Sequence, residues 1–258
     1  MADTDVSQAV LFCRGRLREE ADPVFQKGQL HFFKSGSQEY EAIENYGVRG
    51  TKLKRIEQEL YRQIKLWPAA RRVRLCESLW KSGKLEEGVL AIYLCRRFAR
   101  HFGPEDFQRF EKWLDRYVHN WAHADGLASW LLAACIGNRP GLRLELAGWT
   151  TSRNRWKRRA AAVSLLQEAK AGRHTDFIFE IAEALRGDAD DMVRKGVGWL
   201  LKESYPRRNR EVVEFLGSRP APFARAVLRY AAEKMTAADR GAALGQTAAG
   251  RNRRGVNS

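Results

Sequence analysis

An indole and a carboxylate lie four residues apart in this 258-residue chain, at Trp121 and Asp125. They belong to the stretch HNWAHADGLASW, which joins two apolar helical patterns. Four residues make about one helical turn, so the two side chains can share a helix face. A carboxylate beside an aromatic ring on a cationic protein suits chemistry on nucleic acid. The structural alternatives are a buried Trp121 and an Asp125 that caps a helix.

Two histidines in the same stretch, His119 and His123, are also four residues apart, a spacing that a metal site can use. The surrounding sequence offers no further ligand set, so we expect no metal and no cofactor. The chain also lacks a phosphate-cradling glycine loop and a Ser/His/Asp signature.

A basic run follows at the junction of a polar loop and a helix. Five of the seven residues from 153 to 159 are basic: Arg153, Arg155, Lys157, Arg158 and Arg159. Backbone amides at a helix start favour anions, and guanidinium groups match phosphate geometry. A solvated surface is the alternative, but the run agrees with the charge of the whole chain. Arg159 precedes three alanines, which places it near the packed side of its helix.

A second segment, residues 192–200, combines two basic residues, two glycines and an indole. Arg194 and Lys195 precede Gly196, Gly198 and Trp199. Each glycine inside a helix costs about 1 kcal/mol relative to alanine. Close helix packing, or close approach of a DNA backbone, would justify that cost. Trp199 as an ordinary core residue is the alternative.

The elements that must position these residues are helices. About a dozen apolar patterns at helical spacing are joined by short loops, and no strand pattern occurs. We therefore predict an all-α fold of stacked helical pairs, an α-solenoid, with a compact bundle as the alternative. The pattern predicts one domain over residues 1–235. From Thr236 the apolar stripe is lost, so residues 236–258 are predicted to be a disordered basic tail.

Composition narrows the partners. The chain has 46 Lys and Arg against 31 Asp and Glu, a formal charge of +15 and a pI near 10.0. The tail contributes a net charge of +3, so the domain itself is basic and favours a polyanion. The sequence contains no run of 18 consecutive apolar residues, so we predict no membrane-spanning segment. The four cysteines lie far apart within apolar patterns, which favours reduced thiols in the cytoplasm.

Four landmarks together resemble the AlkD-type DNA alkylation-repair glycosylases, which are built from HEAT-like helical repeats. They are Tyr46–Arg49 opening a helix that Thr51 can cap, Trp121 with Asp125, the run from Asn154 to Ala161, and Val193–Trp199. They occur in the family's order and at similar separations over roughly residues 25 to 232. Arg49 is followed by Gly50, without the proline often found there.

The resemblance implies a solenoid with a concave, basic face for duplex DNA, and hydrolysis of the N-glycosidic bond of alkylated purines such as 7-methylguanine and 3-methyladenine without base flipping. Asp125 matches the catalytic carboxylate, Trp121 and Trp199 the aromatic cleft walls, and Arg159 the cleft arginine. No lysine stands out as a Schiff-base nucleophile, which indicates a monofunctional enzyme. We expect a monomer near the nucleoid whose further DNA contacts come from these residues: Arg49, Thr51, Lys52, Lys54, Arg153, Arg155, Lys157, Arg158, Arg194 and Lys195.

Two other functions are compatible with the sequence. A helical-repeat protein could bind DNA without catalysis, or it could be a scaffold for other proteins. The basic charge disfavours the scaffold, because protein partners do not require it.

Overall fold

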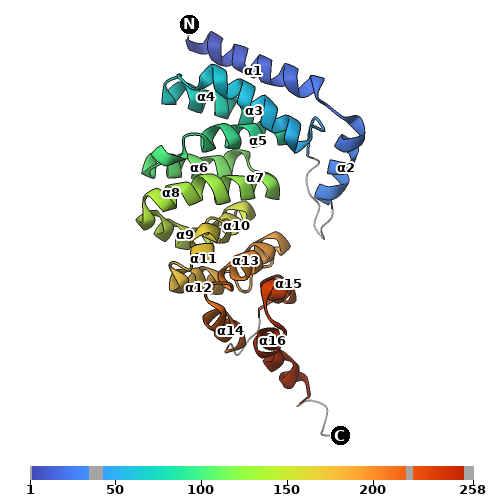
Figure 1. Ribbon diagram of the computed structural model, residues 1–258, viewed down its shortest axis with the longest axis vertical. Coiled ribbons are helices and arrows are strands. Elements are labelled where there is room, and N and C mark those ends of the chain that lie inside the picture. The colour runs from blue at the N-terminus through green and yellow to red at the C-terminus, as the bar shows by residue number, and fades with distance from the viewer. Residues whose placement is uncertain (1, 35–42, 219–222, 253–258) are drawn as a thin grey trace. The chain divides into compact units, whose positions relative to one another are not determined.

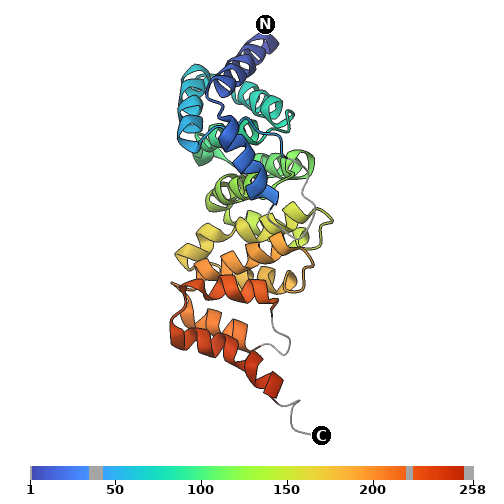
Figure 2. The same ribbon diagram turned by 90° about the vertical axis from the view of Figure 1, so that its right-hand side faces the viewer.

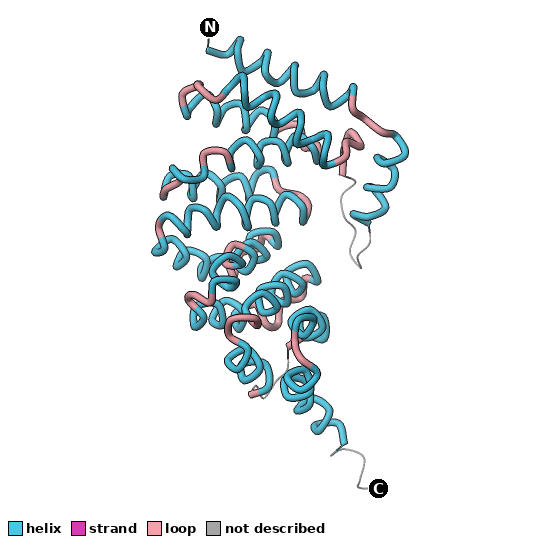
Figure 3. The backbone as a smooth tube through the Cα atoms, viewed as in Figure 1, coloured by secondary structure: helices cyan, strands magenta, loops and turns pink. Residues whose placement is uncertain are grey.

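The protein is helical throughout the residues that the computed structural model describes, which are 2–34, 43–218 and 223–252 (Figure 3). No strand occurs in those ranges, so the predicted all-α class is confirmed. The chain divides into two compact units, Met1–Asn138 and Arg139–Ser258. The single domain predicted over residues 1–235 spans both units and stays a prediction.

Unit 1 is a stack of helices in which successive elements lie side by side (Figure 1). Its elements are α1 (Ala2–Glu19), α2 (Pro23–Lys34), α3 (Gly50–Ile64), α4 (Ala69–Trp80), α5 (Leu85–Arg96), η1 (Ala99–His101), α6 (Pro104–Tyr117), α7 (Trp121–Gly126), η2 (Leu127–Leu132) and α8 (Ala133–Asn138). Helix α5 contacts α3 on one side and both α7 and η2 on the other. Large side chains such as Ile56, Leu90 and Trp113 are fully or almost fully buried among these helices.

Helix α7 continues directly into η2 and α8, so Trp121–Asn138 is one helical run. The η2 segment is a π-helical turn that begins two residues after Asp125. Short π-helical insertions are rare and often occur at functional sites. The π-helical turn therefore lies in the same stretch as the predicted pair of Trp121 and Asp125.

Unit 2 has the same helical character (Figure 2). Its elements are η3 (Pro140–Leu144), α9 (Glu145–Trp149), α10 (Arg155–Val163), α11 (Leu166–Ala171), α12 (Thr175–Ala184), α13 (Asp191–Ser204), α14 (Asn209–Gly217), α15 (Arg225–Ala231), η4 (Ala232–Lys234) and α16 (Ala237–Asn252). Helix α13 is central, because it packs against α10 on one side and α15 on the other. Val193, Val197 and Leu200 of α13 are completely buried.

The prediction of a disordered tail from Thr236 is wrong for residues 237–252, which form α16. Helix α16 packs on α14, with Ala243 only 1% exposed, and the Tyr205 hydroxyl donates a hydrogen bond of 2.5 Å to Asp239. Alanine has the highest helix propensity, and small residues allow close packing without a stripe of large apolar side chains. Residues 253–258 of the predicted tail lie outside the described ranges.

All four cysteines, Cys13, Cys76, Cys95 and Cys135, are free thiols. Among the described helices, none combines the length and the apolar character that a membrane crossing requires.

Candidate functional site

Helix α7 begins at Trp121 because Asn120 caps it. The Asn120 side chain accepts a hydrogen bond of 2.9 Å from the backbone amide of His123. Asp125 therefore lies inside the helical run, and its alternative role as the N-cap residue is wrong. Trp121 and Asp125 are both partly exposed, one turn apart on the same run. The carboxylate–indole pair can thus reach a ligand from one face.

His123 anchors this helix to α5. Its Nε2 atom donates a hydrogen bond of 2.8 Å to the backbone oxygen of Leu85, and its Nδ1 atom accepts one of 3.0 Å from the Asn120 amide. Burial lowers the pKa of His123 from 6.5 to about 4, although the Leu85 contact acts in the opposite direction. Both ring nitrogens are already used, which leaves none for a metal. No cluster of three potential metal ligands occurs among the described residues.

Trp121 is supported from α2 by Phe33, a residue outside the predicted site. The ring of Phe33 lies 5.3 Å from the ring of Trp121, with 32° between the planes. Phe33 is 8% exposed, so one side of the indole is covered by packing. Because 87 residues separate these two rings along the chain, no local pattern predicts the contact.

The loop before α3 is fixed by a buried carboxylate. Glu86, which is 2% exposed, accepts hydrogen bonds of 2.9–3.1 Å from the backbone amides of Tyr46, Gly47 and Val48. The neighbouring Glu87 accepts one of 2.7 Å from the Tyr46 hydroxyl. The sequence reading missed both glutamates, which lie in the first turn of α5. They hold the starts of α3 and α5 together.

The predicted DNA contacts around α3 differ in their surroundings. Arg49 is the N-cap residue of α3, so Thr51 is not the cap and lies exposed within the helix. The Arg49 guanidinium pairs with Asp22 at 3.2 Å, and Lys52 pairs with Glu20 at 2.9 Å. Lys54 is exposed and lines a hollow beside α5.

In unit 2, Arg159 lies on the packed side of α10, as its position before three alanines predicts. The residue is 6% exposed, and its guanidinium donates a hydrogen bond to the backbone oxygen of Met192. Its aliphatic stem lies against Gly196, since a Cβ added there would be 3.3 Å from Arg159 Cγ. Arg159 therefore contacts α13, the helix that carries Trp199.

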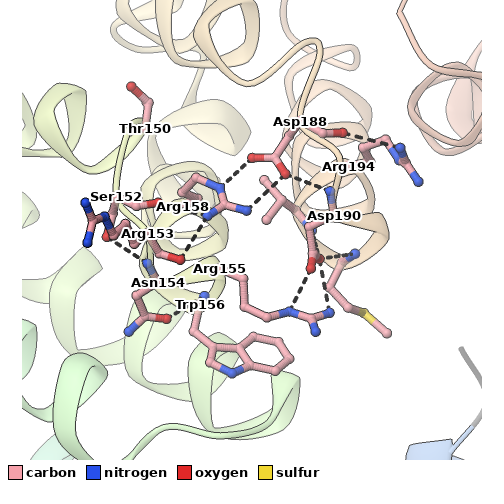
Figure 4. Close-up of polar contacts among 12 residues, drawn as sticks. Thr150, Ser152, Arg153, Asn154, Arg155, Trp156, Arg158, Asp188, Asp190 and Arg194 are labelled. Carbon is pink, nitrogen blue, oxygen red and sulfur yellow. Dashed lines mark hydrogen bonds and ion pairs between the residues drawn. The ribbon is translucent and has the colours of Figure 1, made fainter. Parts of the chain in front are cut away.

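Two other arginines of α10 hold the start of α13 (Figure 4). Arg155 pairs with Asp190 through contacts of 2.8 and 3.1 Å, and Arg158 pairs with Asp188 through contacts of 2.6 and 3.2 Å. Asp190 also caps α13, accepting from the amides of Met192 and Val193. These guanidinium groups already have carboxylate partners, so packing two helices is a role for them beside the predicted phosphate contact.

The remaining predicted cations are more peripheral. Arg153 is exposed, and Lys157 lies over the ring of Trp149 at 5.4 Å. Lys195 pairs with Asp191 at 2.7 Å, and Arg194 donates a hydrogen bond of 3.3 Å to the backbone oxygen of Asp188. Screened pairs of this kind are weak and can exchange for a stronger anion.

The glycines of α13 serve helix packing in this structure. A Cβ at Gly198 would lie 2.6 Å from Tyr230 Cβ and 3.0 Å from the backbone oxygen of Val227, both in α15. Trp199, between the packed faces, remains partly exposed. Trp199 is therefore not completely buried, and its place in the aromatic cleft stays a prediction.

Each unit thus carries two of the four residues that were predicted to be catalytic. Unit 1 carries Trp121 and Asp125 on one helical run, and unit 2 carries Arg159 and Trp199 on two helices in contact. The protein is helical and carries an excess of positive charge, together with a partly exposed carboxylate–indole pair and a helix-bound arginine. These features are typical of proteins that bind a polyanion.

Comparisons with known proteins agree with this class. The family model described as DNA alkylation repair enzyme matches residues 13–235, and the chain belongs to that family. A solved structure described as a predicted DNA alkylation repair enzyme from Enterococcus faecalis superposes with a TM-score of 0.75 at 15% identity, covering 84% of this chain and 98% of the other. No curated protein matches the sequence.

Proposed function

We propose that this protein is a monofunctional DNA glycosylase that hydrolyses the N-glycosidic bond of cationic alkylated purines, such as 7-methylguanine and 3-methyladenine, in duplex DNA. The observation that carries the proposal is Asp125, a partly exposed carboxylate one turn from Trp121 at a π-helical turn, in a chain of the DNA alkylation repair enzyme family. The excess of positive charge supports duplex DNA as the partner.

The proposed hydrolysis requires a carboxylate but no strong general acid. A purine alkylated at N3 or N7 is positively charged, so the glycosidic bond breaks with both electrons passing to the purine. The sugar then becomes oxocarbenium-like, as in glycoside hydrolysis. Asp125 stabilises that positive charge and orients a water molecule, which forms the bond to the sugar carbon and releases one proton to solvent.

The other residues have separate roles in the proposal. The ring faces of Trp121 and Trp199 stabilise the cationic sugar and base by cation–π contact, at about 0.5–2 kcal/mol each. Arg159, which contacts α13 through the backbone oxygen of Met192, is the group that holds a phosphate near the lesion in this proposal. Stacked helical repeats with a concave basic face would present these groups to an unflipped duplex. We expect a monomer acting at the nucleoid in a reducing cytoplasm.

The test is release of 7-methylguanine from duplex DNA by the full chain. We expect Asp125→Asn to lower the single-turnover rate at least 100-fold, because a neutral amide loses the electrostatic stabilisation. DNA affinity should change less than about threefold. The matched control is Asp176→Asn, an exposed aspartate in α12.

The alternatives predict other results. Tight DNA binding without base release by the wild type would indicate a non-catalytic DNA-binding protein. Affinity that does not depend on salt concentration would contradict phosphate-dominated binding and favour a protein scaffold.

A further inference from the structure

A hollow of about 310 Å³ lies between α3 and α5 in unit 1, outside the residues that the proposed chemistry uses. Charged and polar head groups surround it, while side-chain stems and the Tyr93 ring make most of its surface apolar. The lining residues are Lys54, Glu57, Gln58, Tyr93, Arg96 and Arg97. Such a lining suits a small charged group better than an apolar compound.

The net charge of this hollow is positive because its single acid is already neutralised. Arg97 donates two hydrogen bonds to Glu57, at 2.8 and 2.7 Å, in a bidentate pair. Glu57 is 5% exposed, so the pair is partly withdrawn from solvent. Lys54 and Arg96 remain as exposed cations, and no carboxylate within the described ranges forms an ion pair with either of them.

Arg96 is held in place by an aromatic ring instead of an acid. Its guanidinium carbon lies 4.7 Å from the centre of the Trp130 ring, and the Tyr93 ring lies 5.4 Å from the same indole. Stacking restrains the planar guanidinium but does not consume its N–H donors. A restrained guanidinium with available donors matches the bidentate geometry of a phosphate.

The hollow is connected to the candidate catalytic residue through Trp130. Trp130 follows Asp125 by five residues in one helical run, a rise of about 7.5 Å. Successive phosphates of one DNA strand are about 3.4 Å apart along the duplex axis. Because this spacing is smaller than the axial rise, a phosphate close to the lesion and not a remote one is the group expected at the hollow.

We propose that this hollow binds one backbone phosphate of the DNA strand, with Arg96 as the bidentate donor and Lys54 as the second cation. The proposal rests on the proposed function, because it takes duplex DNA as the substrate. It adds a phosphate site in unit 1 to the contacts expected at helix starts. Arg97 acts on Glu57 and keeps the acid from repelling the phosphate.

The first experiment compares charge-neutral variants with matched controls. Arg96→Gln with Lys54→Gln should weaken binding of a 7-methylguanine duplex about 10-fold at low salt, and should lower the salt slope of log affinity by about one. Arg116→Gln with Lys112→Gln removes the same charge from exposed positions of α6 and should change affinity less than about twofold. Equal losses in the two double variants would overturn the site.

A second experiment identifies the phosphate directly. Single phosphates along the strand are replaced by neutral methylphosphonate, and each duplex is titrated with wild type and Arg96→Gln. We expect one position, one to three nucleotides from the lesion, where the replacement weakens wild-type binding about fivefold but does not weaken the variant further. Identical profiles for the two proteins would overturn the proposal.

The two proposals fail separately. If the wild type releases no base but the methylphosphonate position is found, the glycosylase function falls and the phosphate site stands. If base is released and no such position exists, the glycosylase function stands and the phosphate site falls. Circular dichroism melting of each variant confirms that changes in affinity do not come from unfolding.

Discussion

His123 Nε2 donates a hydrogen bond of 2.8 Å to the backbone oxygen of Leu85, joining the first turn of α7 to the start of α5. Leu85 offers only an acceptor, so this nitrogen carries the proton, and Nδ1 accepts from Asn120. A second ring proton would point at the Asn120 amide group, which is a donor. The helix that carries Trp121 and Asp125 is therefore held by a neutral imidazole.

Acid should weaken this link. The pKa of His123 is about 4 in the folded protein because of burial, against 6.5 ordinarily, so the unfolded chain binds the proton first as pH falls. The contribution of His123 to stability is complete above pH 6.5 and decreases between pH 6.5 and 4, by about 3 kcal/mol in all. Urea unfolding of wild type and His123→Gln at several pH values measures the difference. His101→Gln, which removes an exposed histidine, should give a curve parallel to wild type; a constant difference for His123→Gln would contradict the prediction.

Gly88 should not tolerate a methyl group. A Cβ there would lie 2.5 Å from His123 Nε2 and 2.8 Å from a ring carbon of Trp80. Because both neighbours are buried rings, Gly88→Ala is expected to cost about 1–3 kcal/mol of unfolding free energy. Gly15→Ala in α1 is the control, since nothing lies within 4 Å of its Cβ position, and it should stabilise the protein by about 0.5–1 kcal/mol. Thermal unfolding with the opposite order would refute the prediction.

The two glycines of α13 should differ in sensitivity. Gly198→Ala meets the Val227 backbone at 3.0 Å and must displace α15, at about 1–3 kcal/mol. Gly196→Ala first meets the Arg159 side chain at 3.3 Å, which can move, so its cost should be below about 1 kcal/mol. Urea unfolding of both variants is the measurement. Equal destabilisation would show that backbone contact with α15 is not the deciding difference.

Asp190 should matter far more than its neighbour Asp191. Asp190→Ala removes the cap of α13 and leaves Arg155 without its paired carboxylate, so we expect a loss of about 2–3 kcal/mol. Asp191→Ala removes surface pairs with Lys195 and Arg194, each worth less than about 0.5 kcal/mol. The comparison is made by denaturant titration. Similar losses for the two variants would exclude a special role for the Arg155–Asp190 pair.

Local patterns were enough to predict several features. Apolar spacing predicted helices because a helix repeats about every 3.6 residues whatever packs on it. Pro23 begins α2 and Asp190 caps α13, and both effects operate within one turn of the chain. The prediction of a disordered tail was wrong for residues 237–252 because α16 depends on packing against α14 and not on an apolar stripe of its own.

The candidate site likewise has features that the sequence predicts and features that only the packed structure reveals. The sequence by itself determined the helical class, the excess of positive charge, the family and the residue types at Trp121, Asp125, Arg159 and Trp199. Tertiary structure decided which cations are paired with acids, as at Arg158 and Asp188, thirty residues apart. It also decided that His123 anchors α7 and that Phe33 supports Trp121. Such contacts join distant segments, and their geometry arises only when the helices pack together.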